Sequence, residues 1–511
     1  MEESLQRLDA FFNPKSVAVI GATKKTGKAG YVIFRNLAVN KQQRGTFKGE
    51  LYPVNPGEDE IFGFPCYESL SKIPKDQIDL VAIIVPAKAV ASVLKEAVTK
   101  KVKAAVIITA GFKEIGNKEM EEEVVAIAKQ GNIRLLGPNC LGVFYSKSGI
   151  DTLFLPEMKT LSTGEEIVAT PRPMSGNIAM ITQSGAFGSA ALDYLTGRQM
   201  GVSKFVSFGN KCDVSEAEML DYLQHDDETK VILVYLEDIK DGRRFIDVAK
   251  KVTLKKPVVV IKSGRSNAGA RAAASHTGAI AGSDKIYDAV FEQCGVIRAK
   301  SMEEFFDYGK ALAMQPPALG KNIGILTDAG GPGVMTVDEL EAQGLTADHF
   351  NKETDAKFTK LQQEGKILMI AATHNPVDLT ASVLDDQFTM SADIMFQDPD
   401  TYGIILLGLH HMPGLKEKYI DDIAALTHIY HKPIVMVDIG ETEMALYTRS
   451  RFDRLNVPAF GSPEDAARAM KALVWYGEYL KKNGAYEKYV KNFKSVAAPT
   501  QAQTPIKFKK E

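Results

Sequence analysis

One pattern occurs three times along this chain of 511 residues: a short apolar strand, a glycine-rich loop and a segment rich in small residues. The three copies begin at Ser16, Asn177 and Asn322. Strands of nearly continuous Val, Ile and Leu that alternate with helical segments are typical of parallel sheets covered by helices on both faces. The pattern therefore predicts an α/β protein built of open, doubly wound sheets, whose ligands bind at the carboxyl ends of the strands.

The length predicts about three domains, at roughly 150 residues each. Polar connections rich in Pro and Gly separate the three copies, and after Leu480 the chain becomes rich in Lys and then in Ala, Pro, Thr and Gln. We predict domains at residues 1–150, 165–315 and 320–480, followed by a tail at 481–511.

Composition narrows the possible partners. The 62 Lys and Arg residues nearly balance the 64 Asp and Glu residues, which disfavours nucleic acid and anionic membranes as ligands. The four cysteines have no metal-ligand spacing, so we expect a reducing compartment and no metal site. The N-terminus is acidic rather than basic, and no apolar run reaches the roughly 18 residues of a membrane span. We expect a cytoplasmic protein.

The first glycine loop follows the strand that starts at Ser16, and it lacks the G-x-G-x-x-G spacing of dinucleotide sites. The second strand of this copy ends at Asn55 and Pro56, where an NAD enzyme would carry an acid for the ribose hydroxyls. This disfavours an NAD-dependent oxidoreductase. Lys24, Lys25 and Lys28 would suit a nucleotide with several phosphates, although a solvated loop on a structural domain stays open as the alternative.

A histidine, His276, lies within the small residues of segment 274–284. Small residues let a phosphate-sized group approach the backbone N–H groups. In the second copy of the pattern, Ser184 opens a helix, and a helix N-terminus also attracts anions. The two segments together predict an anion pocket that contains a nucleophilic histidine.

Phosphohistidine chemistry also needs a carboxylate that orients the imidazole ring. Glu237 ends an apolar strand and is the candidate, because the carboxyl ends of parallel strands converge on the site. An ordinary strand-end acid and a locally hydrogen-bonded histidine are the simpler alternatives. The absence of a G-x-S-x-G motif around Ser184 disfavours a serine hydrolase. The other seven histidines are interpreted as structural or solvated.

Seven motifs together resemble the α-type subunit of NDP-forming acyl-CoA synthetases, relatives of succinyl-CoA synthetase. These motifs lie at 16–22, 51–56, 137–142, 183–188, 275–284, 329–333 and 375–379, so that the resemblance covers most of the chain. It implies a Rossmann-like CoA-binding domain followed by two flavodoxin-like domains.

The resemblance also implies roles for single residues. His276 would be the phosphorylated histidine and Glu237 its partner. Phosphate would be held by Ser184, Gly185, Ala186, Thr277 and Gly278. Coenzyme A would be bound by Gly21, Ala22, Thr23, Lys24, Lys28, Asn55, Pro56, Val85 and Pro86. The acyl or carboxylate group would lie near Asn139, Cys140, Ala329, Gly330 and Gly331, with a bystander role equally open for Cys140.

The family also uses an ATP-grasp domain, and this chain has neither room for one after residue 480 nor a P-loop motif. We therefore expect a separate ATP-grasp β subunit, in an α2β2 assembly, that supplies ATP or ADP and Mg²⁺. The expected reaction joins a small carboxylic acid and CoA at the expense of ATP, giving acyl-CoA, ADP and phosphate. A non-catalytic CoA-binding regulatory or scaffold protein is the alternative, and the intact motif around His276 argues against it.

Overall fold

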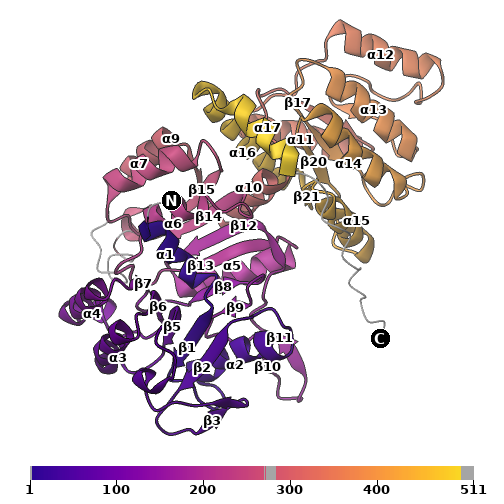
Figure 1. The fold of residues 1–511 in the computed structure, drawn as a ribbon. Coiled ribbons are helices and arrows are strands. Elements are labelled where there is room, and N and C mark those ends of the chain that lie inside the picture. Colours follow the sequence, from indigo (N-terminus) through magenta and orange to yellow (C-terminus); the bar gives the residue numbers. More distant parts are fainter. Residues whose placement is uncertain (1–2, 270, 272–283, 497–511) are drawn as a thin grey trace. The chain divides into compact units, whose positions relative to one another are not determined.

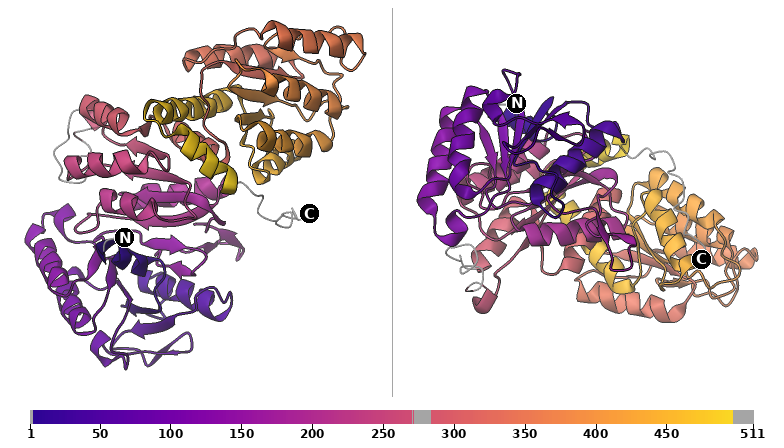
Figure 2. Two further views of the ribbon diagram at one scale, coloured as in Figure 1. Left: turned by 45° about the horizontal axis from the view of Figure 1, so that its top comes forward. Right: turned by 90° about the horizontal axis from the view of Figure 1, so that it is seen from below.

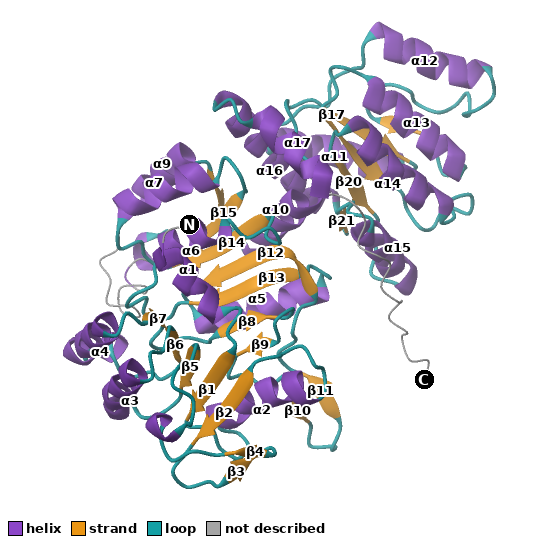
Figure 3. Cartoon of the chain, viewed as in Figure 1, coloured by secondary structure: helices purple, strands orange, loops and turns teal. Residues whose placement is uncertain are grey.

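The computed structural model describes residues 3–269, 271 and 284–496, and Figure 1 labels its helices and strands. The chain divides into two compact units, Met1–Lys300 and Ser301–Glu511. The first unit contains two large sheets and the second unit contains one, so each copy of the sequence pattern contributes to its own sheet. Figure 3 shows strands and helices alternating throughout both units. The predicted α/β class with parallel sheets is confirmed.

The first sheet has five parallel strands in the order β2-β1-β5-β6-β7. They are β1 (Ser16–Ile20), β2 (Glu50–Val54), β5 (Leu80–Ile83), β6 (Ala104–Ile107) and β7 (Arg134–Leu136), connected by α2 (Ala29–Gln42), α3 (Ala87–Thr99) and α4 (Lys118–Gln130). A small hairpin of β3 (Glu60–Ile61) and β4 (Phe64–Pro65) follows β2. Helices α3 and α4 lie side by side over one face of the sheet (Figure 2). Every residue of β1, β5 and β6 is buried, as a sheet covered on both faces requires.

The second sheet has seven strands in the order β16-β15-β14-β12-β13-β8-β9. The five strands from β16 to β13 are parallel, and β8 and β9 join the edge of β13 in antiparallel fashion. The strands are β8 (Val143–Tyr145), β9 (Ile150–Asp151), β12 (Ser175–Thr182), β13 (Val202–Ser207), β14 (Val231–Leu236), β15 (Val258–Lys262) and β16 (Val296–Ala299). The helices are α5 (Gly185–Gly197), α6 (Glu216–Leu223), α7 (Gly242–Val252) and α9 (Asp284–Cys294), and β10 (Met158–Thr160) pairs with β11 (Glu166–Val168) in a separate hairpin.

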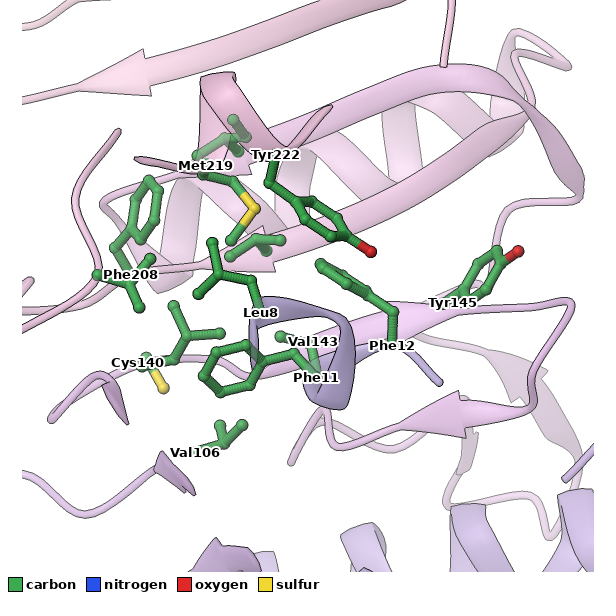
Figure 4. Close-up of a cluster of buried hydrophobic side chains, with 14 of the residues drawn as sticks. Leu8, Phe11, Phe12, Val106, Cys140, Val143, Tyr145, Phe208, Met219 and Tyr222 are labelled. Atoms are coloured by element: carbon green, nitrogen blue, oxygen red, sulfur yellow. The ribbon is translucent and has the colours of Figure 1, made fainter. Parts of the chain in front are cut away.

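One continuous hydrophobic core joins the two sheets of the first unit. The N-terminal segment, α1 (Glu3–Leu8) and the short 3-10 helix Asp9–Phe11, inserts its apolar side chains into this core. Phe12 stacks on Tyr222 of α6, with 5.4 Å between the ring centroids, and the Tyr222 hydroxyl donates to Asp9. Figure 4 shows Phe11 of this segment beside Cys140, with Phe208 in the same cluster; Cys140 and Phe208 belong to the loops after β7 and β13. The core therefore lies directly behind the loops at the carboxyl ends of the strands.

The second unit is a five-stranded parallel sheet in the order β18-β17-β19-β20-β21. Its strands are β17 (Ile323–Thr327), β18 (Val377–Asp378), β19 (Gly403–Leu407), β20 (Ile434–Val437) and β21 (Ala459–Phe460). Its helices are α10 (Met302–Met314), α11 (Gly330–Ala342), α12 (Lys352–Gln363), α13 (Asp385–Gln397), α14 (Lys418–Tyr430), α15 (Glu443–Arg454), α16 (Pro463–Lys482) and α17 (Tyr486–Val496).

Three elements, β8, β9 and α10, lie differently from the domain limits expected from the sequence. Strands β8 and β9 precede residue 152, yet they complete the second sheet rather than the first, because they cover the open edge of β13. Helix α10 precedes residue 315, yet it packs against α16 in the second unit. Its Lys310 side chain is buried there and pairs with Asp453 at 2.8 Å. Among the described helices, none is long and apolar enough to cross a membrane.

Candidate active site

A cavity of about 920 Å³ lies in the first unit, where the carboxyl ends of its two sheets meet. From the first sheet it is lined by Ala29, Ile84, Val85, Ile108, Thr109, Ala110, Lys113, Glu114, Asn139, Cys140 and Leu141. From the second sheet it is lined by Phe154, Leu155, Gln183, Ser184, Gly185, Ala186, Ser189, Gly209, Asn210, Glu237, Asp238 and Lys240. Open α/β sheets bind their ligands at this end of the strands. The cavity thus brings together the predicted Glu237, the start of α5 and the segment around Asn139.

The phosphate-binding segment predicted at Ser184 forms the N-terminus of α5. Ser184 caps the helix, and its Oγ accepts a hydrogen bond from the backbone N–H of Phe187 at 3.2 Å. The first-turn N–H groups of a helix have no acceptor within the helix, and the helix dipole makes this end attractive to anions. Gly185 and Ala186 of this turn line the cavity. The local structure therefore suits an anion such as phosphate.

Glu237 follows β14 and lines the same cavity. Its backbone N–H donates to Oε1 of Gln183 at 2.9 Å, which ties the ends of β14 and β12 together. Burial raises the pKa of the neighbouring Tyr235 hydroxyl, and the negative charge of Glu237 raises it further. The Tyr235 ring stacks on Phe187 of α5 at 4.2 Å between centroids. Glu237 is thus fixed beside the start of α5.

Cationic side chains also reach this region. Lys240 lines the cavity, and its Nζ donates to the carbonyl oxygens of Asn210 and Lys211 at 3.0 and 2.6 Å. Loss of hydration lowers the pKa of Lys240, and the nearby ammonium groups of Lys211 and Lys113 lower it further. Lys113 lines the cavity as well. These two lysines place positive charge in a lining that also carries the carboxylates of Glu114, Glu237 and Asp238.

Loops from both sheets are joined at the cavity by Asn210. Its Nδ2 donates to Glu114 Oε2 at 2.6 Å and to Glu121 Oε2 at 2.9 Å. Burial alone would raise the pKa of Glu114, but the hydrogen bond from Asn210 and those from Gly111 and Phe112 hold the pKa of this carboxyl below its ordinary value. Glu114 therefore stays ionised and holds the loop after β6 in place.

Asn139 and Cys140 line the cavity, and their expected role at the acyl group stays a prediction, but Cys140 is not an activated thiol. Cys140 is buried, its Sγ donates to the carbonyl oxygen of Ile107 at 3.4 Å, and burial raises the pKa of the thiol to about 12. A thiol with such a pKa carries almost no thiolate at neutral pH. The geometry favours the bystander role for Cys140.

The residues expected to bind coenzyme A divide into two groups. Of the nine expected residues, Val85 lines the cavity; Ala29, the first residue of α2, lines it too but was not among those expected. Gly21 has φ +94°, and an added Cβ would lie 2.4 Å from the carbonyl oxygen of Ile84, so the loop needs glycine there. Both polar atoms of the Asn55 side chain bind neighbouring loop backbone. Nδ2 donates to the Ala22 carbonyl at 2.7 Å, and Oδ1 accepts from the Gly57 N–H at 2.9 Å.

The other expected CoA-binding positions lie on or beside the same loop and at the start of α3. Lys24 forms an ion pair with Glu58 at 3.6 Å, and Lys28 immediately precedes α2. Thr23 accepts a hydrogen bond from the backbone N–H of Lys25 at 3.2 Å. Pro56 is exposed, and Pro86 precedes α3. Their role in binding coenzyme A stays a prediction.

In the second unit, Ala329, Gly330 and Gly331 lie at the N-terminus of α11, a position like that of Ser184, Gly185 and Ala186 on α5. A Cβ on Gly330 would lie 2.9 Å from Oδ2 of Asp378. The expected carboxylate-binding role of these three residues stays a prediction. His276, Thr277 and Gly278 lie outside the described residues. Within residues 3–269, 271 and 284–496, no group of three or more His, Cys, Asp or Glu side chains could hold a metal ion.

Several cavity residues were not predicted as site residues from the sequence: Gln183, Asp238, Lys240, Asn210 and Glu114. Gln183 and Asp238 directly adjoin the predicted Ser184 and Glu237. Their position just after the end of a strand could therefore have identified them as site residues. Asn210 follows β13, whose sequence Val-Ser-Lys-Phe-Val-Ser lacks the continuous apolar pattern of the other strands. Lys204 in this strand is buried and pairs with Asp226 at 2.8 Å, which explains how a lysine is accommodated there.

Comparisons with known proteins identify the family of the chain. A family described as a CoA binding domain matches residues 15–146, and a family described as a succinyl-CoA ligase like flavodoxin domain matches residues 175–312. The α subunit of acetate–CoA ligase [ADP-forming] II from Pyrococcus furiosus is 38% identical over 482 residues, which cover 91% of this chain and 97% of that protein.

A single-chain relative and a solved structure extend the comparison. The acetate–CoA ligase [ADP-forming] of Methanocaldococcus jannaschii is 36% identical over 485 residues, 94% of this chain but 65% of that protein. The structure of dinucleotide forming acetyl-coenzyme A synthetase 1 from Ca. Korarchaeum cryptofilum, in complex with phosphate and ADP, matches with a TM-score of 0.82 and 36% identity. This match covers 95% of the present chain and 98% of the other.

Proposed function

The chain belongs to the family of ADP-forming acetate–CoA ligase α subunits, a family of acid–thiol ligases, and from this premise we propose that it handles CoA, acyl group and phosphate in an NDP-forming acyl-CoA synthetase. The overall reaction is acid, CoA and ATP to acyl-CoA, ADP and phosphate, and it is reversible. The observation that carries the proposal is the cavity of about 920 Å³, at which Glu237, the N-terminus of α5 and the loops of the CoA-binding domain meet.

In the thioester-cleaving direction, a phosphate oxygen attacks the carbonyl carbon of the acyl-CoA. The C–S bond breaks, the CoA sulfur takes a proton, and an acyl phosphate forms. The N–H groups at Gly185 and Ala186 and the ammonium group of Lys240 stabilise the negative charge of the phosphate oxygens. The loops after β12 and β14 thus hold the reacting anion, while the loops of the first sheet hold CoA.

His276 then attacks the phosphorus atom of the acyl phosphate. The bond between phosphorus and the acyl oxygen breaks, the carboxylate leaves, and a phosphohistidine remains. Glu237 accepts the N–H of the other ring nitrogen and stabilises the positive charge that develops on the imidazole. This division of one transfer into two steps conserves the energy of the thioester in the phosphohistidine.

The final transfer to ADP requires an ATP-grasp partner chain. A relative of nearly the same length is named an α subunit, which supports a separate partner subunit. That partner would bind ATP or ADP with Mg²⁺.

Labelling of His276 tests the proposal. The purified chain is incubated with acetyl-CoA and radioactive phosphate, and the label is assayed for acid lability and base stability. We expect label on the native chain and on His225→Ala, a control at an exposed histidine of the same unit, and no label on His276→Ala. Label on His276→Ala would overturn the histidine's role. A native chain that binds CoA but never takes up label would instead favour a non-catalytic scaffold.

A further inference from the structure

Gln183, the residue before the helix cap Ser184, connects the ends of two strands through three hydrogen bonds. Its Oε1 accepts from the backbone N–H groups of Glu237 at 2.9 Å and Asp238 at 3.2 Å. Its Nε2 donates to Asp238 Oδ1 at 2.5 Å. The side chain is 9% exposed, so water cannot readily replace these bonds. Gln183 therefore fixes the backbone from which the Glu237 carboxylate projects.

Asp238 is also bound by a buried lysine, Lys211, which contacts the same carboxylate oxygen as Gln183. Nζ of Lys211 lies 3.0 Å from Asp238 Oδ1, 2.8 Å from the Asp238 carbonyl oxygen and 2.9 Å from Oε2 of Glu216. An ammonium group has three protons, and these three acceptors can use all of them. Only 1% of the Lys211 side chain is exposed. The ammonium is thus enclosed by protein acceptors rather than by water.

The carboxylate of Asp238 keeps its negative charge near neutral pH, which suits a network of fixed geometry. Burial alone would raise the pKa of Asp238, but Lys211 and the hydrogen bond from Gln183 hold the pKa of this carboxyl below its ordinary value. Lys240 and Lys262 also act on Asp238 electrostatically, and so does Tyr287. Asp238 is therefore a stable acceptor at neutral pH.

We propose that Gln183, Asp238 and Lys211 form a positioning network that sets the place of the Glu237 carboxylate in the cavity. This inference rests on the proposed function, in which Glu237 stabilises the reacting histidine. None of the three residues needs to touch a substrate. The network acts through the two N–H groups that Gln183 binds, and a shift of about 1 Å in a catalytic group can cost ~100-fold in rate.

The network contains one amide and one carboxylate that face each other, and their positions can be exchanged. Gln183→Glu places two carboxylates together, and Asp238→Asn places two amides together. The double variant Gln183→Glu/Asp238→Asn restores one carboxylate and one amide with the same net charge. The carboxylate introduced at position 183 could still accept from both N–H groups. With its Nδ2 in the place of Oδ1, the amide introduced at position 238 could donate to that carboxylate, while Lys211 would keep the backbone carbonyl of position 238 and Glu216 as acceptors. If the substitutions slow the reaction only by disturbing the local packing, their effects should add up in the double variant. If they slow it by moving the Glu237 carboxylate, the double variant should recover.

Two measurements test the proposal on the full chain: the rate of His276 phosphorylation from acetyl-CoA and phosphate, and amide hydrogen exchange over residues 237–241. We expect each single variant to react roughly 10- to 100-fold more slowly and to exchange faster, and the double variant to recover to within about threefold. The pH dependence gives a further readout. In Gln183→Glu one of the paired carboxylates has a raised pKa, so its rate relative to the native chain should rise as the pH falls from 8 to about 6.

The failure of this inference differs from the failure of the proposed function. Glu237→Gln is assayed beside the network variants. If the native chain takes up no label, the proposed function is wrong, and if Glu237→Gln reacts at the native rate, Glu237 does not orient the histidine. In either case the hydrogen exchange of the single variants still tests whether the network holds residues 237–241 in place. If Glu237→Gln is slow while both single network variants keep native rates and native exchange, the positioning network is wrong. A double variant worse than both single variants would also overturn it.

Discussion

The loop from β12 to α5 in the first unit and the loop from β17 to α11 in the second unit share one backbone design. In the first, Thr182 Oγ1 donates to the Ser184 carbonyl at 2.7 Å and accepts from the Ser184 N–H at 3.2 Å. In the second, Thr327 makes the same two bonds with Ala329, at 2.9 and 3.0 Å. In both loops the side chain of the residue after the threonine also accepts a hydrogen bond from a backbone N–H group that lies just after the end of a neighbouring strand. Gln183 accepts from Glu237, and Asp328 accepts from Leu409 at 2.8 Å.

The two loops differ in how they compensate charge. In the first, the buried Lys211 neutralises the acids around Gln183. In the second, Asp328 and Asp438 are 1% and 0% exposed, and each has one carboxylate oxygen without a hydrogen-bond partner in the described part of the chain. His410 binds the other oxygen of Asp438 at 2.8 Å. The comparison teaches that the glycine loop and helix N-terminus are a common scaffold, and that the charges around them set what each loop can do.

Lys211→Met would make the first loop resemble the second, because Asp238 and Glu216 would lose their cation. Removal of one partner from a buried ion pair costs about 3–5 kcal/mol. We expect the free energy of unfolding of the first unit to fall by that amount, measured by circular dichroism in urea. The only tryptophan, Trp475, lies in the second unit, so its fluorescence should change little. Lys251→Met, at an exposed lysine, is the control, and equal stability of the two variants would refute the comparison.

Asp328→Asn would bring the second loop closer to the first by replacing a carboxylate with an amide. Burial raises the pKa of Asp328 to about 7, despite the N–H of Leu409, and Asp438 and Asp378 raise it further. The folded state therefore binds more protons than the unfolded state between the two pKa values, and stability should fall as the pH rises from about 4 to 7. The loss is up to ~4 kcal/mol, at 1.36 kcal/mol for each pKa unit. Trp475 fluorescence in urea should show this loss in the native chain and a flatter profile in Asp328→Asn.

Glu237→Gln tests whether only the first loop carries the carboxylate that the chemistry needs. We expect the rate of His276 phosphorylation to fall ~10²–10³-fold, because a fixed electrostatic contact to the reacting group is lost. Glu441→Gln is the control, since that exposed acid follows β20 in the second unit. A decrease of less than about twofold in Glu237→Gln across the pH range would exclude Glu237 as the orienting carboxylate.

The smallest change in stability is expected from substitution of Gly188 in α5 and Gly333 in α11, the glycines that let these helices pack closely on their sheets. A Cβ on Gly188 would lie 2.8 Å from Thr182 Cγ2 and 2.9 Å from Phe205 Cζ, whereas a Cβ on Gly333 would lie 3.0 Å from Thr327 Cγ2. We expect Gly188→Ala to cost about 1–3 kcal/mol and Gly333→Ala less, since alanine favours the helix in both. Urea unfolding of both variants checks the order, and a larger cost at Gly333 would contradict it.

The sequence predicted the fold class and the convergence of Glu237 with the start of α5, because apolar strands and glycine loops obey local rules. It did not predict the place of β8 and β9, since a strand's sheet is decided by which edge it covers. It also did not predict the role of Lys211, whose ammonium group is enclosed only because Asp238, 27 residues away, lies beside it in the folded chain. His410, interpreted from the sequence as structural or solvated, is bound to a buried carboxylate, a contact that only the pairing of β19 and β20 creates.

The antiparallel pairing of β8 with β13 makes the first unit difficult to divide. A fragment cut at residue 150 would carry away β8 and sever β9, and the remaining chain would expose the unpaired edge of β13. Exposed edges of this kind promote aggregation. The CoA-binding region is therefore better excised, grafted or crystallised together with the sheet that follows it, at a cut near residue 300 rather than near residue 150. Because β8 and β9 follow the first sheet in the chain but complete the second, the two sheets and the cavity that they line form one unit that should be transferred as a whole.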